Sequence, residues 1–270
     1  MNLSDLVRLA LQEDIGNGDV TTDAIIPRDL QGTARVLAKQ HLVVCGHDVA
    51  REVFRQLDAE YSVEVNEGET VAPMTVIARV KGAVRSLLKG ERLALNFMMR
   101  LCGIATHTHD TVQHASNGLK VVDTRKTTPL LRALERRAVR IGGGHNHRFA
   151  LYDGILIKDN HIKAAGSVTK AVQQARAHGH HLLRIEVEVS DLDMLREAIG
   201  LGVDVILLDN MDDPTIAKAL SINQGRATIE ASGNMSKERL PALSRLGVDI
   251  VSIGGLIHQA TWADLSMKID

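Results

Sequence analysis

The sequence of 270 residues predicts an α/β fold, in which an incomplete parallel α/β barrel follows a smaller α+β domain. After residue 118, short apolar runs alternate with helix-like stretches, as they do in parallel sheets with right-handed βαβ crossovers. The chain after Gly103 is shorter than the roughly 250 residues of a closed eight-stranded barrel, so we expect the barrel to be incomplete. Before Gly103, strands and helices mix without this alternation, which is typical of an α+β unit.

The elements of the first domain follow from apolar spacing and turn signals. A helix is expected to start with Ser4 as its cap and to end before the turn-rich segment 14–19. Strands are expected at 33–38, 61–65 and 75–80, and helices at 49–57 and 87–99. No linker marks a boundary. We place it near Gly103, which gives domains 1–103 and 104–270 and leaves the last few residues able to pack back on the first domain.

The second domain is expected to contain six strands that run in one direction. Continuous apolar runs are typical of strands that are covered on both faces, which favours one buried parallel sheet. The expected strands are 119–123, 154–157, 182–189, 203–208, 227–229 and 248–252, and the helices between them are 168–177, 192–199, 214–220 and 237–246.

The composition argues against several classes of protein. Lys and Arg number 32, Asp and Glu number 33, and aromatic residues make up 2% of the chain, so a basic or base-stacking nucleic-acid binder is not expected. No apolar run reaches the roughly 18 residues of a membrane span, and the N-terminus does not resemble a signal peptide. Two cysteines, Cys45 and Cys102, form no disulfide framework, which suggests a reducing compartment. We expect a cytoplasmic protein without nucleic-acid or membrane partners.

Polar residues stand where each apolar run of the second domain stops. In parallel α/β folds, chemistry gathers at the carboxyl ends of the strands. Six polar ends that converge on one mouth therefore indicate a functional site. They occupy positions 123–128, 158–161, 186 and 188, 209–210, 230–234 and 252–255.

The charges at these ends are of two kinds. Four cations, Arg125, Lys126, Arg148 and Lys158, would repel one another in an empty cleft, so they indicate an anionic ligand. Two carboxylates, on Glu188 and Asp209, suit Mg²⁺ or the hydroxyl groups of a sugar. The alternative is that these carboxylates are ion-paired with the same Lys and Arg residues.

Two glycine-bearing stretches complete the candidate site. The Ser232-Gly233 and Gly254-Gly255 pairs each follow a strand and precede a helix, so their backbone N–H groups can face a phosphate; a plain tight turn is the alternative. The segment 142–148, Gly-Gly-Gly-His-Asn-His-Arg, delivers His147 and Arg148 towards the barrel. No Cys or carboxylate spacing supports a zinc site here, so His147 is expected to donate a hydrogen bond to an anion.

Several motifs together resemble quinolinate phosphoribosyltransferase. They are Asp-Thr-Arg-Lys-Thr-Thr-Pro at 123–129, Gly-Gly-Gly-His-Asn-His-Arg at 142–148, Leu-Ile-Lys-Asp-Asn-His at 156–161, Glu-Val-Glu at 186–188, Glu-Ala-Ser-Gly at 230–233 and Ser-Ile-Gly-Gly at 252–255. The resemblance covers nearly the whole chain. It implies a type II phosphoribosyltransferase-like fold and a homodimer or higher assembly with a shared active site. It also implies transfer from phosphoribosyl pyrophosphate to quinolinate with Mg²⁺, which yields nicotinate mononucleotide, pyrophosphate and CO₂ in NAD biosynthesis.

The resemblance also implies a role for each site residue. Lys126, Lys158, Glu188 and Asp209 would be catalytic, and Glu188 and Asp209 would serve the ribose hydroxyls and the Mg²⁺, directly or through the substrate. Quinolinate would be held by Arg125, His147, Arg148, Lys158 and an Arg92 that reaches across the dimer, with Thr124 beside them. The phosphoribosyl donor would contact Lys126, and its 5′-phosphate would lie against Ser232, Gly233, Asn234, Ile253, Gly254 and Gly255.

Three residues depart from the family pattern, and three rival functions stay open. Leu130 and Asn234 stand where Gly is common in the family, and Gln259 stands where Ser is common; Asn tolerates a left-handed backbone. The rivals are a lyase in which Lys158 forms a Schiff base, a non-decarboxylating relative, and a non-catalytic protein, which either binds a phosphate ligand or is a relative associated with molybdenum transport.

Overall fold

The computed structural model describes residues 2–270, which form two compact units. The first unit contains the chain up to His109 together with Thr128–Gly143 and Gln259–Asp270, and the second contains Asp110–Thr127 and Gly144–His258. Packing therefore assigns three segments to the first unit. The expectation of a single domain boundary near Gly103 stays a prediction.

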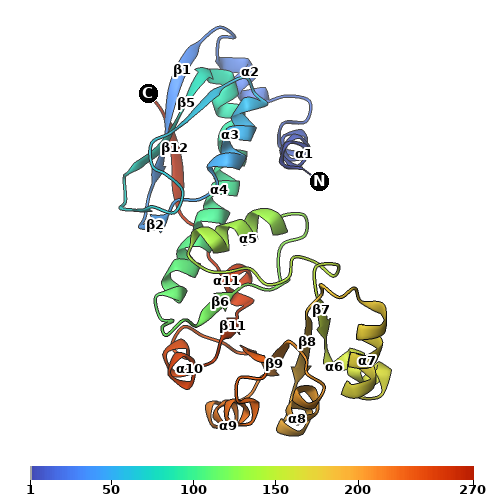
Figure 1. Ribbon diagram of the computed structural model, residues 1–270. Coiled ribbons are helices and arrows are strands. Elements are labelled where there is room, and N and C mark those ends of the chain that lie inside the picture. The colour runs from blue at the N-terminus through green and yellow to red at the C-terminus, as the bar shows by residue number, and fades with distance from the viewer. Residues whose placement is uncertain (1) are drawn as a thin grey trace. The chain divides into compact units, whose positions relative to one another are not determined.

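An antiparallel sheet organises the first unit (Figure 1). Its strand order is β12-β1-β5-β3, and β2 pairs separately with β4. The last strand of the chain joins this sheet, because Ala34 of β1 pairs with Ile269 of β12. The elements are α1 (Leu3–Ile15), α2 (Val20–Ile25), β1 (Gln31–Ala38), β2 (Leu42–Val43), α3 (His47–Arg55), β3 (Glu60–Val63), β4 (Thr70–Val71), β5 (Val76–Ala83), α4 (Val84–Val112, whose last turn passes into the second unit), α5 (Arg132–Ile141) and β12 (Leu265–Ile269).

Local caps explain where the first helices begin. The cap of α1 is Asn2, whose side chain accepts the N–H of Asp5 at 2.8 Å, and the expectation that Ser4 caps this helix is wrong. A second helix, α2, was not expected. Asp19 caps it by accepting the N–H groups of Thr21 and Thr22, as short polar side chains do at helix starts.

The helix expected at 87–99 is much longer in the structure. Helix α4 spans 29 residues, from Val84 to Val112. Its buried side chains continue past Met99 through Leu101, Cys102, Ile104 and Ala105. This apolar stripe keeps the helix packed. Gly103 lies within the stripe, and only glycine fits there because a Cβ would lie too close to the Thr261 carbonyl oxygen.

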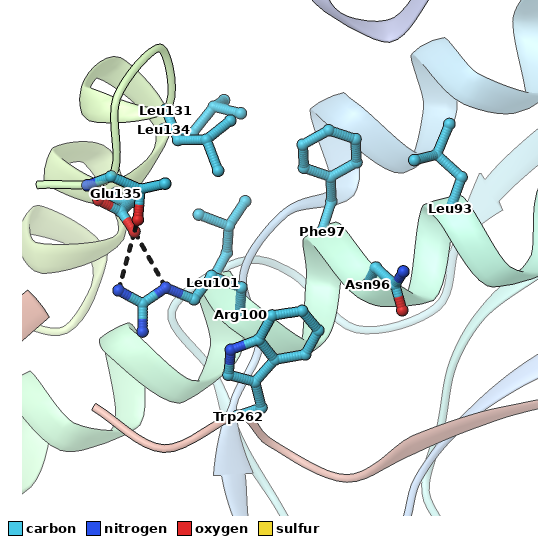
Figure 2. A pocket seen from close by; sticks show the side chains of 10 residues that line it. Leu93, Asn96, Phe97, Arg100, Leu101, Leu131, Leu134, Glu135 and Trp262 are labelled. Atoms are coloured by element: carbon cyan, nitrogen blue, oxygen red, sulfur yellow. Dashed lines mark hydrogen bonds and ion pairs between the residues drawn. The ribbon is translucent and has the colours of Figure 1, made fainter. Parts of the chain in front are cut away.

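A small cavity lies within the first unit beside α4 and α5 (Figure 2). Its volume is about 300 Å³, and most of its walls are apolar, including Phe97 and Trp262. Glu135 is fully buried at one side and accepts two hydrogen bonds from Arg100, at 2.9 and 2.8 Å. The N–H of Thr128 also donates to Glu135, at 2.8 Å. These bonds compensate for the burial of the carboxylate.

The second unit is built on a six-stranded parallel sheet, as the alternating pattern predicted. The strand order is β6-β11-β10-β9-β8-β7, so β6 and β7 are the edges, and no ladder joins them in the described chain. The elements are β6 (Lys120–Val122), β7 (Ile155–Ile157), α6 (Asp159–Ala165), α7 (Val168–His178), β8 (Ile185–Val189), α8 (Leu192–Gly200), β9 (Val205–Asp209), α9 (Asp213–Asn223), β10 (Thr228–Ser232), α10 (Leu240–Leu246), β11 (Ile250–Ser252) and α11 (Gly255–His258).

The segment that carries His147 runs beside the edge strand β6. His145 forms a parallel bridge with Val122, because its N–H donates to the Val121 carbonyl at 2.8 Å and its carbonyl accepts the Asp123 N–H at 3.0 Å. This short bridge directs the chain after His145 along the carboxyl end of the sheet. In residues 2–270, no helix is long and apolar enough to cross a membrane.

Candidate active site

Most of the predicted site residues lie at the carboxyl ends of the parallel strands of the second unit. Each loop or strand end contributes a few of them. They are Thr124, Arg125 and Lys126 after β6, His147 and Arg148 in the segment beside it, Lys158 after β7, Glu188 in β8, Asp209 in β9, Ser232, Gly233 and Asn234 at the end of β10, and Ile253, Gly254 and Gly255 after β11. Arg92 differs: it is an exposed residue of α4 in the first unit.

The loop after β6 carries two exposed cations. Arg125 and Lys126 have no carboxylate partner in the described part of the chain, and the Lys126 N–H donates to Thr124 Oγ1 at 3.1 Å. The Lys126 side chain passes close to Gly254, since a Cβ on that glycine would lie 2.8 Å from Lys126 Cδ. The loops after β6 and β11 are therefore in contact, as the strand order predicts.

Arg148 is held near a like charge. Its Nη1 donates to the Gly154 carbonyl at 2.9 Å. Burial lowers the pKa of Arg148, the positive charge of Arg125 lowers it further, and the Glu186 carboxylate opposes both. Arg125 and Arg148 are therefore close enough for their positive charges to repel, an arrangement that favours the binding of an anion.

Lys158 and Glu188 form an ion pair across β7 and β8. Lys158 Nζ lies 2.7 Å from Glu188 Oε2, and the two side chains are 46% and 14% exposed. For Glu188, the ion-pair alternative from the sequence therefore describes the structure without ligand. The pair brings a cation and a carboxylate to adjacent positions at the same mouth.

Left-handed backbone follows both β9 and β10, and the Asn210 N–H donates to the Ser232 carbonyl at 2.9 Å. Asn210, which follows Asp209, has a φ of 53° and donates to the Asp209 Oδ1 at 3.0 Å. Asn234 has a φ of 49°, in agreement with the expectation that Asn would tolerate this backbone, and its amide donates to Asn210 Oδ1 at 3.2 Å. Gly233, with a φ of 89°, has no room for a side chain, because a Cβ would lie 2.2 Å from Asn210 Oδ1.

His147 is enclosed by two buried carboxylates. Its Nε2 lies 3.2 Å from Glu186 Oε2 and 3.5 Å from Glu230 Oε2. Its Nδ1 accepts the backbone N–H of Arg148 at 2.7 Å, and the backbone N–H of His147 donates to Oδ1 of the buried Asp123 at 3.0 Å. Side chains from β8, from β10 and from the residue that follows β6 thus hold His147.

The charge state of His147 is under opposing influences. Burial lowers its pKa, but the hydrogen bonds with Glu186 and Glu230, together with their negative charges, outweigh burial and raise the pKa to about 10. The Arg148 N–H, in contrast, needs a bare Nδ1 and favours the neutral ring. In both forms Nε2 carries a hydrogen, because a neutral ring with a bare Nδ1 is protonated at Nε2.

The hydrogen on His147 Nε2 argues against a metal ion between His147, Glu186 and Glu230. The three offer ligand atoms within 4.8 Å of one another. A metal on Nε2 needs its lone pair, and a metal-bound imidazole usually donates from its other nitrogen. Here the other nitrogen is an acceptor. We therefore describe the cluster as a hydrogen-bonded group.

Sequence reasoning placed Asp123, Glu186, Asn210 and Glu230 among the polar strand ends but gave none of them a role of its own. A signal was present for the two glutamates: Glu186 is two residues before Glu188 on the same face of β8, and Glu230 is two residues before Ser232 on β10. Acidic residues inside apolar strands are rare unless they have a partner. That their common partner is His147 could not be predicted, because it lies outside the strands.

The fold and site define a class of protein: an enzyme-like α/β barrel, incomplete and parallel, whose mouth carries both cations and carboxylates. Residues 19–102 match the family "Quinolinate phosphoribosyl transferase, N-terminal domain", and residues 104–268 match "Quinolinate phosphoribosyl transferase, C-terminal domain". The chain belongs to the quinolinate phosphoribosyltransferase family and is a phosphoribosyltransferase.

The chain aligns with named relatives over almost their whole length. The chain is 46% identical to a "Probable nicotinate-nucleotide pyrophosphorylase [carboxylating]" of Synechocystis, over 96% of this chain and 90% of that protein. It is 41% identical to a protein of the same name from Bacillus subtilis, over 100% and 94%. The structure of NadC from Streptococcus pyogenes superposes with a TM-score of 0.96 at 41% identity, over 99% of this chain and 96% of that one.

Proposed function

We propose that this protein transfers the phosphoribosyl group of phosphoribosyl pyrophosphate to quinolinate and decarboxylates the product, forming nicotinate mononucleotide, pyrophosphate and CO₂ in NAD biosynthesis. The observation that carries the proposal is the placement of Arg125, Lys126 and Arg148. These cations have no salt bridge to a carboxylate among residues 2–270, yet they share one mouth with Glu188 and Asp209. Two multiply charged anions would neutralise them.

Quinolinate is the ligand for the arginines in this proposal. A guanidinium is a planar fork that holds a carboxylate through two parallel hydrogen bonds. Arg125 and Arg148 are close enough for their charges to interact, and quinolinate carries two adjacent carboxylates. Lys158 adds a point charge, and the partner's Arg92 completes the site in a homodimer or higher assembly.

The phosphoribosyl donor is assigned to the other side of the mouth. Lys126 faces its pyrophosphate, and the loops at 232–234 and 253–255 offer backbone N–H groups to its 5′-phosphate. The tight packing at Gly233 and Gly254 supports this assignment, because it leaves backbone instead of side chains at the surface.

Glu188 and Asp209 fit a magnesium ion bound together with the donor. Both supply hard carboxylate oxygens from neighbouring strands, which Mg²⁺ prefers, and Mg²⁺ commonly shares its shell with substrate phosphates. Glu188 already holds Lys158 and Asp209 already accepts from Asn210, so contact through the substrate or water suits them. When bound, the ion would neutralise charge on the pyrophosphate.

The chain's own residues supply position and charge for the reaction. The quinolinate nitrogen gives its electron pair to ribose C1 as the C1–O bond to pyrophosphate breaks, and Lys126 stabilises the departing oxyanion. Glu188 and Asp209 stabilise the positive charge that develops on the ribose. The carboxylate beside the alkylated nitrogen then leaves as CO₂, and its electron pair stays on the ring carbon until a proton arrives.

The rival functions have less support. A Schiff-base lysine is activated by desolvation or by other cations, whereas Lys158 is 46% exposed and paired with Glu188. A non-catalytic or molybdenum-associated relative does not require the complete set of cations. We place the protein in the cytoplasm because Cys45 and Cys102 are both buried free thiols.

The test is an assay of the purified protein with Mg²⁺, phosphoribosyl pyrophosphate and quinolinate. We expect nicotinate mononucleotide, with CO₂ released from the ring carboxylate in equal amount. Product from nicotinic acid and none from quinolinate would assign a non-decarboxylating activity. Binding of both substrates without release of pyrophosphate would refute an enzymatic role.

A further inference from the structure

Both ring nitrogens of His147 are engaged by neighbouring residues. On one side Nε2 faces the carboxylates of Glu186 and Glu230, at 3.2 and 3.5 Å. On the other side Nδ1 accepts the N–H of Arg148 at 2.7 Å. A ring in this position has no nitrogen left to donate to a substrate, which differs from the role that the sequence suggested.

The two glutamates are buried deeply enough to need a specific reason. Glu230 is 2% exposed and Glu186 is 8% exposed, and burial of a carboxylate costs several kcal/mol unless it is paired. They come from separate strands, β10 and β8, yet both reach the same atom, His147 Nε2. The Oε1 atoms of both side chains have no hydrogen-bond partner in the described residues. Packing alone would favour apolar side chains at both positions.

The chain of hydrogen bonds extends from His147 to Arg148. The N–H of Arg148 is fixed by the ring, and the guanidinium of Arg148 is fixed by the Gly154 carbonyl at 2.9 Å. A side chain anchored at both ends loses little freedom when it binds an anion, which increases affinity. The His147 ring is thus a support between two strands of the sheet and the residue that faces the ligand.

We infer that Glu186 and Glu230 are positioning residues that orient the His147 ring, and that His147 in turn positions Arg148 for the substrate carboxylate instead of contacting the substrate itself. This inference rests on the proposed function, since it takes the ligand of Arg148 to be a carboxylate of quinolinate. It deepens that function by separating the residues that bind from those that hold them in place.

The kinetic test compares two substitutions of Glu230. Glu230→Leu removes the acceptor, and we expect the KM for quinolinate to rise about ten-fold while the KM for phosphoribosyl pyrophosphate changes less than about two-fold. Glu230→Gln keeps an oxygen acceptor and should restore most of the affinity, to within about three-fold. The matched control is Asn223→Asp, a buried polar residue bonded to Ala227 before β10, which should lower stability and leave both KM values unchanged.

A double-mutant cycle separates positioning through His147 from a general structural effect. In a His147→Ala background, Glu230→Leu should add less than about a two-fold change in KM for quinolinate, because the ring through which it acts is gone. A further ten-fold rise in that background would overturn the inference.

Nitrogen NMR of the ¹⁵N-histidine-labelled protein gives a readout that does not need activity. We expect His147 to show a protonated Nε2, unchanged when quinolinate is added. Glu186→Gln and Glu230→Gln should each speed exchange of the Nε2 hydrogen. If Glu230→Leu does not fold, the double variant with both Gln substitutions takes its place. A bare Nε2, or a shift of either nitrogen to a quinolinate-bound state, would contradict the inference. If the wild-type protein does not bind quinolinate, the proposed function fails, and the spectra still decide whether the glutamates hold the ring.

Discussion

Gly254 lies against the side chain of Lys126: a Cβ at position 254 would be 2.8 Å from Lys126 Cδ and 3.3 Å from Thr124 Oγ1. Real Cβ contacts are not this short, so any side chain here displaces a neighbour. The neighbour that can move is the flexible lysine. The missing side chain at Gly254 therefore sets where the Lys126 ammonium group can lie.

Gly254→Ala tests this contact. We expect the KM for phosphoribosyl pyrophosphate to rise about ten-fold, because displacement of the Lys126 charge by about an ångström strongly lowers its contribution to binding of this substrate. The free energy of unfolding should change by less than about 1 kcal/mol, since the lysine moves instead of the backbone. Gly200→Ala is the control, because no atom lies within 4 Å of its Cβ position. Unchanged kinetics in Gly254→Ala would show that binding of phosphoribosyl pyrophosphate does not depend on the observed position of the Lys126 side chain.

Arg125→Ala and Arg148→Ala test the anion site. Each removes one of two guanidinium groups whose charges interact, and we expect each to raise the KM for quinolinate by about 100-fold. Isothermal titration with quinolinate measures the affinity directly. Arg196→Ala, which removes an exposed arginine paired with Asp193 in a helix, should have no effect on binding. Affinity retained in both Arg125→Ala and Arg148→Ala would remove them from the site.

Leu130 provides a prediction about stability. Its φ is 68° and its side chain is 75% exposed, so it adopts a left-handed backbone without burying its apolar side chain. This conformation costs a branched residue about 1–2 kcal/mol, and glycine adopts it freely. After the larger entropy of unfolded glycine is subtracted, Leu130→Gly should stabilise the protein by about 0.5 kcal/mol in urea unfolding. Leu130→Ala keeps the Cβ and should bring no gain; equal stability of the two variants would argue against backbone strain.

Glu52 provides a prediction about pH. Hydrogen bonds from Arg55, then from Gln56, lower its pKa from 4.5 to about 2. A carboxyl whose pKa is lowered by folding stabilises the protein above its unfolded pKa, and this contribution is lost as the pH falls. Thermal unfolding between pH 4.5 and pH 2 should therefore show a smaller loss of stability for Glu52→Gln than for the wild-type protein. Equal slopes in this range would mean that the Glu52 bonds contribute nothing.

Local properties of the sequence were enough to predict much of the fold. The six apolar runs predicted the six parallel strands because fully covered strands need continuous apolar side chains. The left-handed backbone at Asn234 agrees with the expectation that a short polar side chain tolerates positive φ. Both properties depend only on a residue and its near neighbours. The polar strand ends likewise predicted the mouth, because parallel strands bring their carboxyl ends to one edge.

Contacts between distant parts of the chain were decided by packing. The last strand, β12, pairs with β1, and nothing in the composition of either strand names its partner. The convergence of Glu186 and Glu230 on His147 depends on the register of β8, β9 and β10 and on the bridge between His145 and Val122. Periodicity shows which face a side chain occupies, whereas its neighbours across a sheet depend on how far each strand is shifted. That shift is set by the packing of the whole unit, so it becomes visible only in the folded protein.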